Sequence, residues 1–284
     1  MHFTKMQGVG NDFVVLDRAD FPLETSFSNL SIRFCNRHFG IGADGLLVVS
    51  RDAPGSAFRM QMFNPDGTED MCGNGLRCVS LWAVRAGWLG TQTEFTVAVK
   101  DGTRQVRILE VEEANRAALI GVDMGVPRLT AEQIPFDAPP GQRIAQYPLM
   151  VEGEEYSITA VSTGSTHTVI FGDAPTEEVF QRVSPQIENN PRFPERTSVL
   201  WATPFGDNGF RVRIWERGAG ETLGCGTGAG AVGVAAVVDG LCDAGKPISI
   251  ISKGGTLKIT WPGENQPVDM VGPAHLIFVG EFGL

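Results

Sequence analysis

Short apolar and aromatic runs separated by glycine, proline and aspartate dominate the chain, and they predict a protein built mainly from β-strands. Two of these runs, residues 58–63 and 210–215, alternate between large apolar and polar side chains, as half-buried strands do. The predicted strands cover residues 46–49, 58–63, 95–99, 106–111, 156–161, 210–215, 247–251 and 257–261.

Two longer apolar segments predict helices instead. Residues 74–86 carry Leu76, Val79 and Leu81 at helical spacing, and residues 227–238 consist almost wholly of alanine, valine and glycine. A helix that is apolar nearly all round has to be buried. We therefore expect each helix to lie inside a strongly bent sheet.

An internal repeat relates the two predicted helices. Each follows a Cys-Gly-x-Gly sequence, at residues 72–75 and 225–228. In both copies an alternating strand precedes the cysteine, and a Lys-x-Gly-Thr sequence begins 28 residues after it. A glycine followed by an apolar run lies 62 residues before the first cysteine and 61 before the second. Four matches in register indicate two homologous lobes.

The repeat predicts an α+β fold of two pseudo-symmetric lobes, each a β-barrel-like sheet around a central helix. The first lobe is expected to span residues 1–121 and the second residues 122–271, with residues 123–127 as the connection. The strand-like run 275–280 has no counterpart in the repeat. We therefore expect residues 272–284 to return to the first lobe.

Composition excludes several classes of function. The 284 residues are 42% hydrophobic and 20% charged, which is typical of a soluble globular protein. A net charge of −10 without clustered lysine or arginine argues against a nucleic-acid partner. No apolar stretch is long enough to span a membrane, the first residues lack a signal-peptide layout, and the five cysteines are scattered. We expect a cytoplasmic protein with no membrane partner.

The cysteine and histidine pattern predicts no metal site. Cys72 and Cys78 are too far apart for a zinc knuckle, and the chain has only four histidines. The Gly40–Gly45 segment matches a dinucleotide-binding glycine pattern, but a helix-like segment precedes it and a strand follows it. The nucleotide motif needs the opposite order, so we interpret this segment as a turn.

The placement of the two cysteines suggests acid–base chemistry. The first N–H groups of a helix lack intrahelical partners and carry partial positive charge, so they bind carboxylates and stabilise thiolates. A cysteine at this position can have its pKa lowered from about 8.5 and act as a base. Two such helix starts facing each other would hold one α-carboxylate, with one sulfur on each face of the adjacent carbon. One sulfur would remove the proton and the other would return one.

Other interpretations exist for these cysteines. A lone cysteine in a glycine-rich turn is usually a small buried hydrophobic residue, and only the duplication favours a catalytic role here. Two facing thiols could also form a reversible disulfide in a redox-sensing or ligand-binding protein.

The chain resembles the diaminopimelate epimerases, which are pyridoxal-independent amino-acid epimerases. The resemblance covers essentially the whole chain and is carried by residues Met6 to Phe13, Gly40 to Gly45, Phe63 to Gly67, Met71 to Gly75 and Glu216 to Gly228. It implies two pseudo-symmetric lobes, an active site in the cleft between them, no cofactor, and a cytoplasmic homodimer. The implied reaction is inversion of LL-2,6-diaminopimelate to the meso form.

The same resemblance implies roles for individual residues. Cys72 and Cys225 match the two catalytic bases, with His167 expected to assist Cys72 and Glu216 to assist Cys225. Two structural interpretations remain open: His167 could be a hydrogen-bonded histidine of the core, and Glu216 could form only an ion pair with Arg217. The residues implied in binding the reacting carboxylate are Gly73, Asn74, Gly226 and Thr227. Those implied in binding the far end of the substrate are Asn11, Asn64 and Arg217.

The chain departs from the family pattern mainly at the far end of the substrate. Ser165 and Ser198 stand where asparagines are usual, and Gln7 replaces the customary histidine. A hydroxyl is shorter than an amide and offers one donor instead of two. The two serines therefore keep open a racemase for another amino acid, such as histidine.

Overall fold

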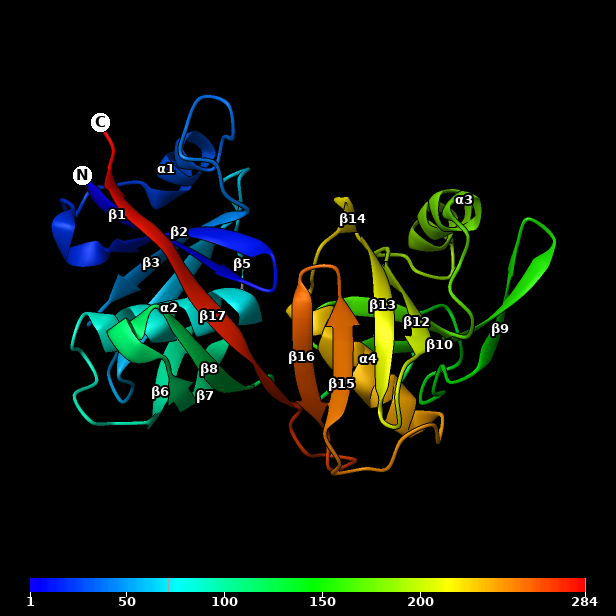
Figure 1. The fold of residues 1–284 in the computed structure, drawn as a ribbon. Coiled ribbons are helices and arrows are strands. Elements are labelled where there is room, and N and C mark those ends of the chain that lie inside the picture. Colours follow the sequence, from blue (N-terminus) through cyan, green and yellow to red (C-terminus); the bar gives the residue numbers. More distant parts are fainter. Residues whose placement is uncertain (71, 284) are drawn as a thin grey trace. The chain divides into compact units, whose positions relative to one another are not determined.

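The computed structural model describes residues 1–70 and 72–283 of the chain, which forms two compact units (Figure 1). The first unit contains Met1–Asp123 and Val271–Leu284, and the second contains Met124–Met270. Met71, which begins one motif of the resemblance, lies outside the described residues, as does Leu284.

Eight strands of the first unit pair in a closed ring. They follow one another in the order β1 (His2–Gly8), β2 (Asn11–Asp17), β3 (Gly45–Ser50), β4 (Phe58–Phe63), β6 (Glu94–Val99), β7 (Gly102–Val111), β8 (Ala117–Asp123) and β17 (Asp269–Glu281). The ring closes because β17 pairs with both β8 and β1. The sheet therefore forms a closed barrel, with the short β5 (Glu69–Asp70) paired beside β4.

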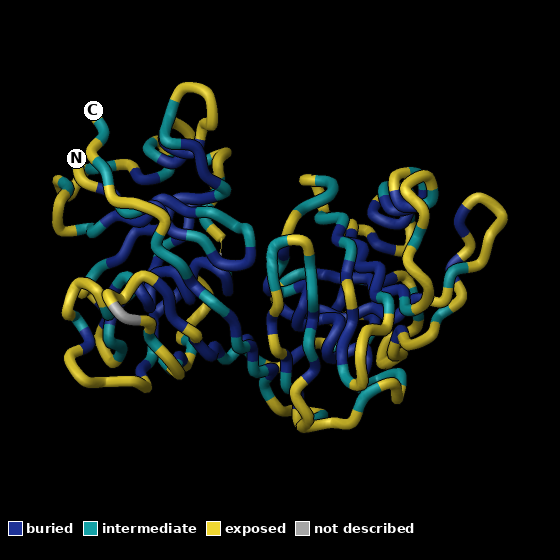
Figure 2. Tube along the Cα trace, in the orientation of Figure 1, coloured by how far each residue is buried: buried dark blue, intermediate teal, exposed yellow. Residues whose placement is uncertain are grey.

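The helix α2 (Gly73–Arg85) forms the core of this barrel. Residues 73–81 are all buried, and the helix packs against β1, β2, β3, β4 and β8. Figure 2 shows the buried trace concentrated in the interior of the unit. A second helix, α1 (Phe27–Phe34), starts at the N-cap Ser26 and packs on the outside against β3 and β4.

The second unit repeats the topology of the first. Its strands are β9 (Tyr147–Val151), β10 (Glu154–Ser162), β11 (Thr166–Phe171), β12 (Ser198–Pro204), β13 (Gly209–Glu216), β14 (Gly220–Thr222), β15 (Ile248–Ser252) and β16 (Gly255–Thr260). The pairs β10–β11, β12–β13 and β15–β16 are antiparallel, whereas β11–β12 and β13–β15 are parallel. In the first unit, β1, β2, β3, β4, β6 and β7 pair in the same succession of antiparallel and parallel directions. The two units therefore share one strand topology, which confirms the predicted duplication.

The buried helix of the second unit, α4 (Gly226–Val238), is also in the predicted place. It packs against β10, β11, β12, β15 and β16, and residues 228–236 are buried. The predicted α+β fold with one central helix in each lobe is therefore confirmed.

One helix was missed by the sequence analysis. The helix α3 (Glu177–Glu188) starts at the N-cap Thr176 and places Phe180, Val183 and Ile187 in a separate apolar core beside β12. Phe180, Val183 and Ile187 recur at helical spacing after the N-cap Thr176, so the pattern was present in the sequence, but the segment was overlooked because Pro185 lies inside the helix and few of its residues are apolar. The expectation of one long helix in each lobe is wrong for the second unit.

The interior of the second unit depends on a close approach between α4 and β16. A Cβ atom added at Gly233 would lie 2.5 Å from Ile259 Cγ2, whereas one added at Gly230 would meet no atom closer than 3.6 Å. Both glycines lie in the same helix and both are buried. Only glycine therefore fits at 233 without displacing the strand.

We expect Gly233→Ala to lower the free energy of unfolding by about 1–3 kcal/mol through overpacking. Gly230→Ala is the matched control, and it should raise stability by about 0.5–1 kcal/mol because alanine favours the helix. Urea unfolding followed by circular dichroism measures both. Equal stability of the two variants would contradict the close packing of α4 on β16.

Candidate active site

Cys72 is the N-cap residue of α2. Its backbone is extended, with φ −140° and ψ 117°, and its sulfur accepts a hydrogen bond from the Gly75 amide at 3.4 Å. The side chain thus sits at the end of the helix where unpaired N–H groups and the helix dipole favour negative charge. The fold provides this placement because Cys72 is the residue directly before the buried helix.

Cys225 occupies the same position on α4. Its backbone angles are φ −130° and ψ 119°, and its sulfur accepts a hydrogen bond from the Gly228 amide at 3.3 Å. The sulfur also lies 3.3 Å from Thr227 Oγ1. Both thiols are therefore N-caps of the central helix in their unit, and both are partly exposed.

A glycine at the third position of each helix lets the helix start close to the sheet. A Cβ at Gly75 would lie 2.9 Å from Leu47 of β3, and one at Gly228 would lie 3.0 Å from Leu200 of β12. These leucines occupy equivalent positions in the two units. The glycines of the repeated motif thus serve packing as well as the open backbone that anion binding needs.

In the first unit, Asn11 lies beside Cys72. Asn11 Oδ1 accepts hydrogen bonds from Cys72 Sγ at 3.6 Å and from Asn74 Nδ2 at 3.4 Å. Asn11 Nδ2 donates to Asp44 at 2.7 Å, and Asn74 Oδ1 accepts from the fully buried Arg77 at 2.7 Å. Two of the predicted binding residues, Asn11 and Asn74, therefore contact each other next to the thiol.

Asn64 is held separately by the turn that follows β4. Its Nδ2 donates to Thr68 Oγ1 at 3.0 Å, and its backbone N–H donates to the Thr68 carbonyl at 2.8 Å. The side chain is half-buried, so this turn fixes its direction while leaving it accessible to a ligand.

In the second unit, parallel pairing of β11 and β12 places His167 opposite Ser198. His167 is 1% exposed, and its Nε2 lies 3.1 Å from Ser165 Oγ. Ser198 Oγ accepts a hydrogen bond from the Arg217 backbone N–H at 3.1 Å, and the Arg217 guanidinium donates to the Glu195 carbonyl at 2.9 Å. The two serines that depart from the family pattern thus contact the predicted histidine and the backbone of the predicted arginine.

Glu216 is the last residue of β13. Its carboxylate accepts a hydrogen bond from the Thr222 hydroxyl of β14, and its carbonyl accepts from Ala219 at 3.0 Å across the turn between these strands. The strand pair therefore fixes the carboxylate and carries the chain from Glu216 to the start of α4 at Cys225.

Thr163 connects the predicted histidine region to the start of α4. Its hydroxyl donates to the Thr227 carbonyl at 2.7 Å, and it lies in the turn between β10 and β11. This contact ties the turn that carries Ser165 to the backbone beside Cys225.

Comparison with known proteins identifies the family. A profile described as diaminopimelate epimerase matches residues 3–130 and 159–277. The chain belongs to the diaminopimelate epimerase family. A diaminopimelate epimerase of Pelotomaculum thermopropionicum is 42% identical over 99% of both chains, and one of Moorella thermoacetica is 40% identical over 100% of both. This membership makes the protein an isomerase.

The fold of this diaminopimelate epimerase family member also occurs in more distant proteins. A crystal structure of a probable proline racemase from Agrobacterium radiobacter matches with a TM-score of 0.72 at 13% identity, covering 100% of this chain and 93% of that one. At this identity the likeness concerns the fold alone.

Several residues around the cysteines were not singled out from the sequence. Asp44, Arg77, Thr163 and Thr222 hold Asn11, Asn74, Thr227 and Glu216 respectively. Asp44 and Thr222 are polar residues near glycines, within segments that carried the resemblance, and this was the signal by which the sequence could have marked them. No such sequence signal marks Arg77 and Thr163, because only the tertiary contacts reveal their partners.

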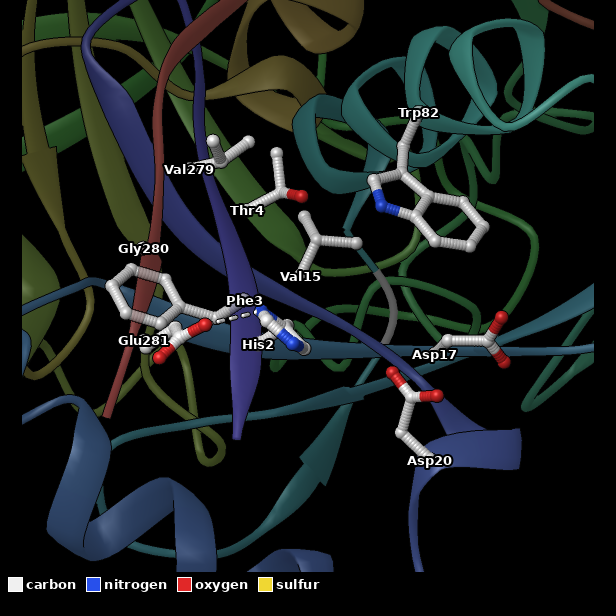
Figure 3. A pocket seen from close by; sticks show the side chains of 10 residues that line it. All are labelled: His2, Phe3, Thr4, Val15, Asp17, Asp20, Trp82, Val279, Gly280 and Glu281. Atoms are coloured by element: carbon white, nitrogen blue, oxygen red, sulfur yellow. Dashed lines mark ion pairs between the residues drawn. The ribbon is translucent and has the colours of Figure 1, made fainter. Parts of the chain in front are cut away.

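Features elsewhere in the described part of the chain do not form a second candidate site. A surface hollow of about 380 Å³ on the first unit is lined by residues of β1, β2, β17 and α2 and by Asp20, and it contains no predicted site residue (Figure 3). Within residues 1–70 and 72–283, no three histidine, cysteine or acidic side chains are placed to hold a metal ion. No helix in these ranges is long and apolar enough to cross a membrane.

Burial keeps His167 neutral in this epimerase. Desolvation, together with the nearby positive charge of Arg217, lowers the pKa of its imidazole to about 3. Its Nδ1 is buried without a hydrogen-bond partner among the described residues. At neutral pH the side chain is therefore an uncharged ring with a free nitrogen lone pair or N–H group.

The low pKa of His167 predicts a loss of stability in mild acid. Below the unfolded pKa of about 6.5 the unfolded chain binds a proton that the folded state excludes, so the free energy of unfolding falls as pH drops. His167→Gln should remove about 2 kcal/mol of the decrease between pH 7.5 and pH 5. Urea unfolding of both proteins across this range measures the difference, and parallel pH curves would show that His167 is accessible to protons.

Proposed function

We propose that the protein inverts one α-carbon of LL-2,6-diaminopimelate to give the meso form, by a two-base reaction without a cofactor. The observation that carries this proposal is that each duplicated unit has a cysteine as the N-cap of its buried helix. The sequence relatives, about 40% identical over the whole chain, bear the name of this activity.

The reaction requires both helix starts to act on one substrate. The backbone N–H groups of Gly73, Asn74, Gly226 and Thr227 would bind the reacting α-carboxylate, since they lie in the first turns of α2 and α4. One thiolate removes the α-proton and becomes a thiol, leaving a carbanion-like centre beside the carboxylate. The other thiol donates its proton to the opposite face and becomes a thiolate. Atoms and charge balance, and the centre is inverted.

His167 and Glu216 would serve as hydrogen-bond partners of the thiols. A neutral imidazole has one N–H donor and one acceptor nitrogen, so His167 would assist Cys72 through a hydrogen bond while its own low pKa keeps the ring uncharged. Glu216 is an acceptor while ionised, and Thr222 holds its carboxylate in one direction. This suits the predicted pairing of Glu216 with Cys225.

Arg217, Asn11 and Asn64 would bind the second carboxylate and amino group of the substrate. Arg217 is exposed, and a guanidinium binds a carboxylate through two parallel hydrogen bonds. Ser165 and Ser198 would take part mainly by holding His167 and the backbone of Arg217, as their hydrogen bonds support. The alternative of a racemase for another amino acid is not favoured, because the relatives of highest identity named above are diaminopimelate epimerases.

We further propose that the enzyme works in the cytoplasm as a homodimer, without nucleic-acid or membrane partners. The acidic net charge of −10 and the partly exposed thiols support this setting, since thiols persist in a reducing compartment.

The two-base reaction predicts that neither cysteine is dispensable. Cys72→Ala and Cys225→Ala should each lower the rate of epimerisation at least about 100-fold, as expected for loss of an acid–base group. Cys242→Ala is the matched control and should retain full activity, because Cys242 lies in neither helix start. The measurement is conversion of LL-diaminopimelate in both directions, and full turnover by either single variant would exclude the two-base reaction.

The substrate assignment predicts selective isotope exchange. LL-diaminopimelate, histidine and several simple amino acids are incubated with enzyme in heavy water and observed by proton NMR. Deuterium should enter the α-position of diaminopimelate alone, because the donated proton comes from a thiol that exchanges with solvent. Exchange into histidine would instead support the racemase, and exchange into no amino acid would support a binding or redox-sensing protein.

A further inference from the structure

A series of side-chain hydrogen bonds in the first unit runs from Arg77 to Asp44 and includes Asn11, the neighbour of Cys72. Arg77 donates to Asn74 Oδ1 at 2.7 Å, Asn74 Nδ2 donates to Asn11 Oδ1 at 3.4 Å, and Asn11 Nδ2 donates to Asp44 Oδ2 at 2.7 Å. Asp44 Oδ1 in turn accepts from Arg37 at 2.7 Å. Asp44 is a surface residue to which the proposed reaction gives no role. It is nevertheless the carboxylate at the outer end of this series of hydrogen bonds.

The charges at the two ends fix the direction of both amides. Arg77 has only donors, so the oxygen of Asn74 has to face it. An ionised Asp44 has only acceptors, so the nitrogen of Asn11 has to face the carboxylate. With these two ends fixed, the only group that Asn11 can present to Cys72 is its carbonyl oxygen, which lies 3.6 Å from the sulfur.

The Asp44 carboxylate is itself held on both oxygens. Oδ2 also accepts from the Asp12 backbone N–H at 3.0 Å, and Arg37 bridges Asp44 and Asp12, which is further paired with the buried Lys5. These cations lower the pKa of Asp12 to about 2. The carboxylate that faces Asn11 therefore has a rigid, cationic support.

We propose that Asp44 is a positioning residue for the reaction, which holds the Asn11 carbonyl against the Cys72 thiol. The proposal rests on the proposed function for its catalytic consequence, but the hydrogen-bond geometry stands without it. The effect acts through Asn11, because Asn11 bonds to the Cys72 sulfur through its oxygen and to Asp44 through its nitrogen, and the Asp44 side chain is 39% exposed.

A carbonyl oxygen next to a thiol favours the protonated sulfur. The S–H group donates to the oxygen, whereas a thiolate would be repelled by it. An amide that turned over would present N–H groups and favour the thiolate instead. Asp44 thus sets how readily Cys72, but not Cys225, gives up its proton.

The described residues of the second unit form a different hydrogen-bond arrangement at the corresponding positions. Thr197 is the counterpart of Asp44, because each lies directly before the equivalent strand, β12 or β3. The Thr197 hydroxyl, however, pairs with Thr168 rather than with a residue next to Cys225. The neighbour of Cys225 is the Thr227 hydroxyl, which both donates and accepts. The two thiols therefore respond differently to changes at Asp44.

The test measures the rate of iodoacetamide alkylation at each cysteine as a function of pH, by peptide mass spectrometry of the intact, folded enzyme. In Asp44→Ala the midpoint for Cys72 should move about half a pH unit lower, because the hydrogen bond to the thiol is weakened. Cys225 in the same sample is the internal control and should not move. Asp44→Ser, whose hydroxyl is too short to reach Asn11, should behave like Asp44→Ala and serves if the alanine variant does not fold.

Two further variants separate positioning from charge. Asp44→Asn loses the ion pair with Arg37 but keeps an oxygen for the two inner donors, Asn11 Nδ2 and the Asp12 N–H, so its Cys72 midpoint should match the wild type. Arg37→Gln also removes the ion pair while leaving Asp44 in place, and should match as well. The charged groups that belong to this network are Lys5 on β1, Asp12 on β2, Arg37 and Asp44 before β3, and Arg77 on α2, and Asp70 on β5 precedes Cys72 in the sequence. All except Asp44 and Arg37 are unchanged in these proteins.

An unchanged Cys72 midpoint in both Asp44→Ala and Asp44→Ser would overturn the proposal, and so would equal shifts in Asp44→Ala and Asp44→Asn or equal shifts at both cysteines. The alkylation readout needs no substrate. Failure of the diaminopimelate assignment would appear in the isotope-exchange experiment and would leave these midpoints unaffected.

Discussion

Capping of a buried helix by a cysteine is the interaction on which the chemistry of this protein depends. Each thiol accepts a hydrogen bond from the third backbone N–H of its helix and faces the positive end of the helix dipole. The helix cannot shift to relax this geometry, because its residues fill the interior of its unit. The sheet around each helix therefore holds the capping thiol, which is the proposed acid–base group, in a fixed position.

The same constraint explains the glycines of the repeated motif. Each helix begins against a leucine of the neighbouring strand, whose terminal methyl group would lie 2.9 Å from a Cβ atom at Gly75 and 3.0 Å from one at Gly228. A larger residue at either position would force the leucine or the helix start to move. Close packing therefore favours glycine at the same two positions where the proposed reaction needs an open backbone.

Duplication supplied two equivalent helix starts, and the surrounding residues made them different. Cys72 lies beside an amide whose direction is set by Arg77 and Asp44, whereas Cys225 lies beside the hydroxyl of Thr227. His167 occupies a position in β11 that corresponds to Phe13 in β2, as their pairing with Ser198 and Gly45 shows. One unit therefore carries a buried imidazole where the other carries an apolar ring.

The sequence by itself determined the duplication, most of the strands, both central helices and the positions of the two cysteines. These features follow from local periodicity and from a motif repeated in register, which need no knowledge of distant contacts. The helix α3 was overlooked although Phe180, Val183 and Ile187 recur at helical spacing, because Pro185 lies inside it. Only the tertiary structure revealed the partners of Asn11, Asn74 and Glu216. The physical reason is that hydrogen bonds such as Asn11 to Asp44 join residues 33 positions apart, and parallel strand pairing decides which of them meet.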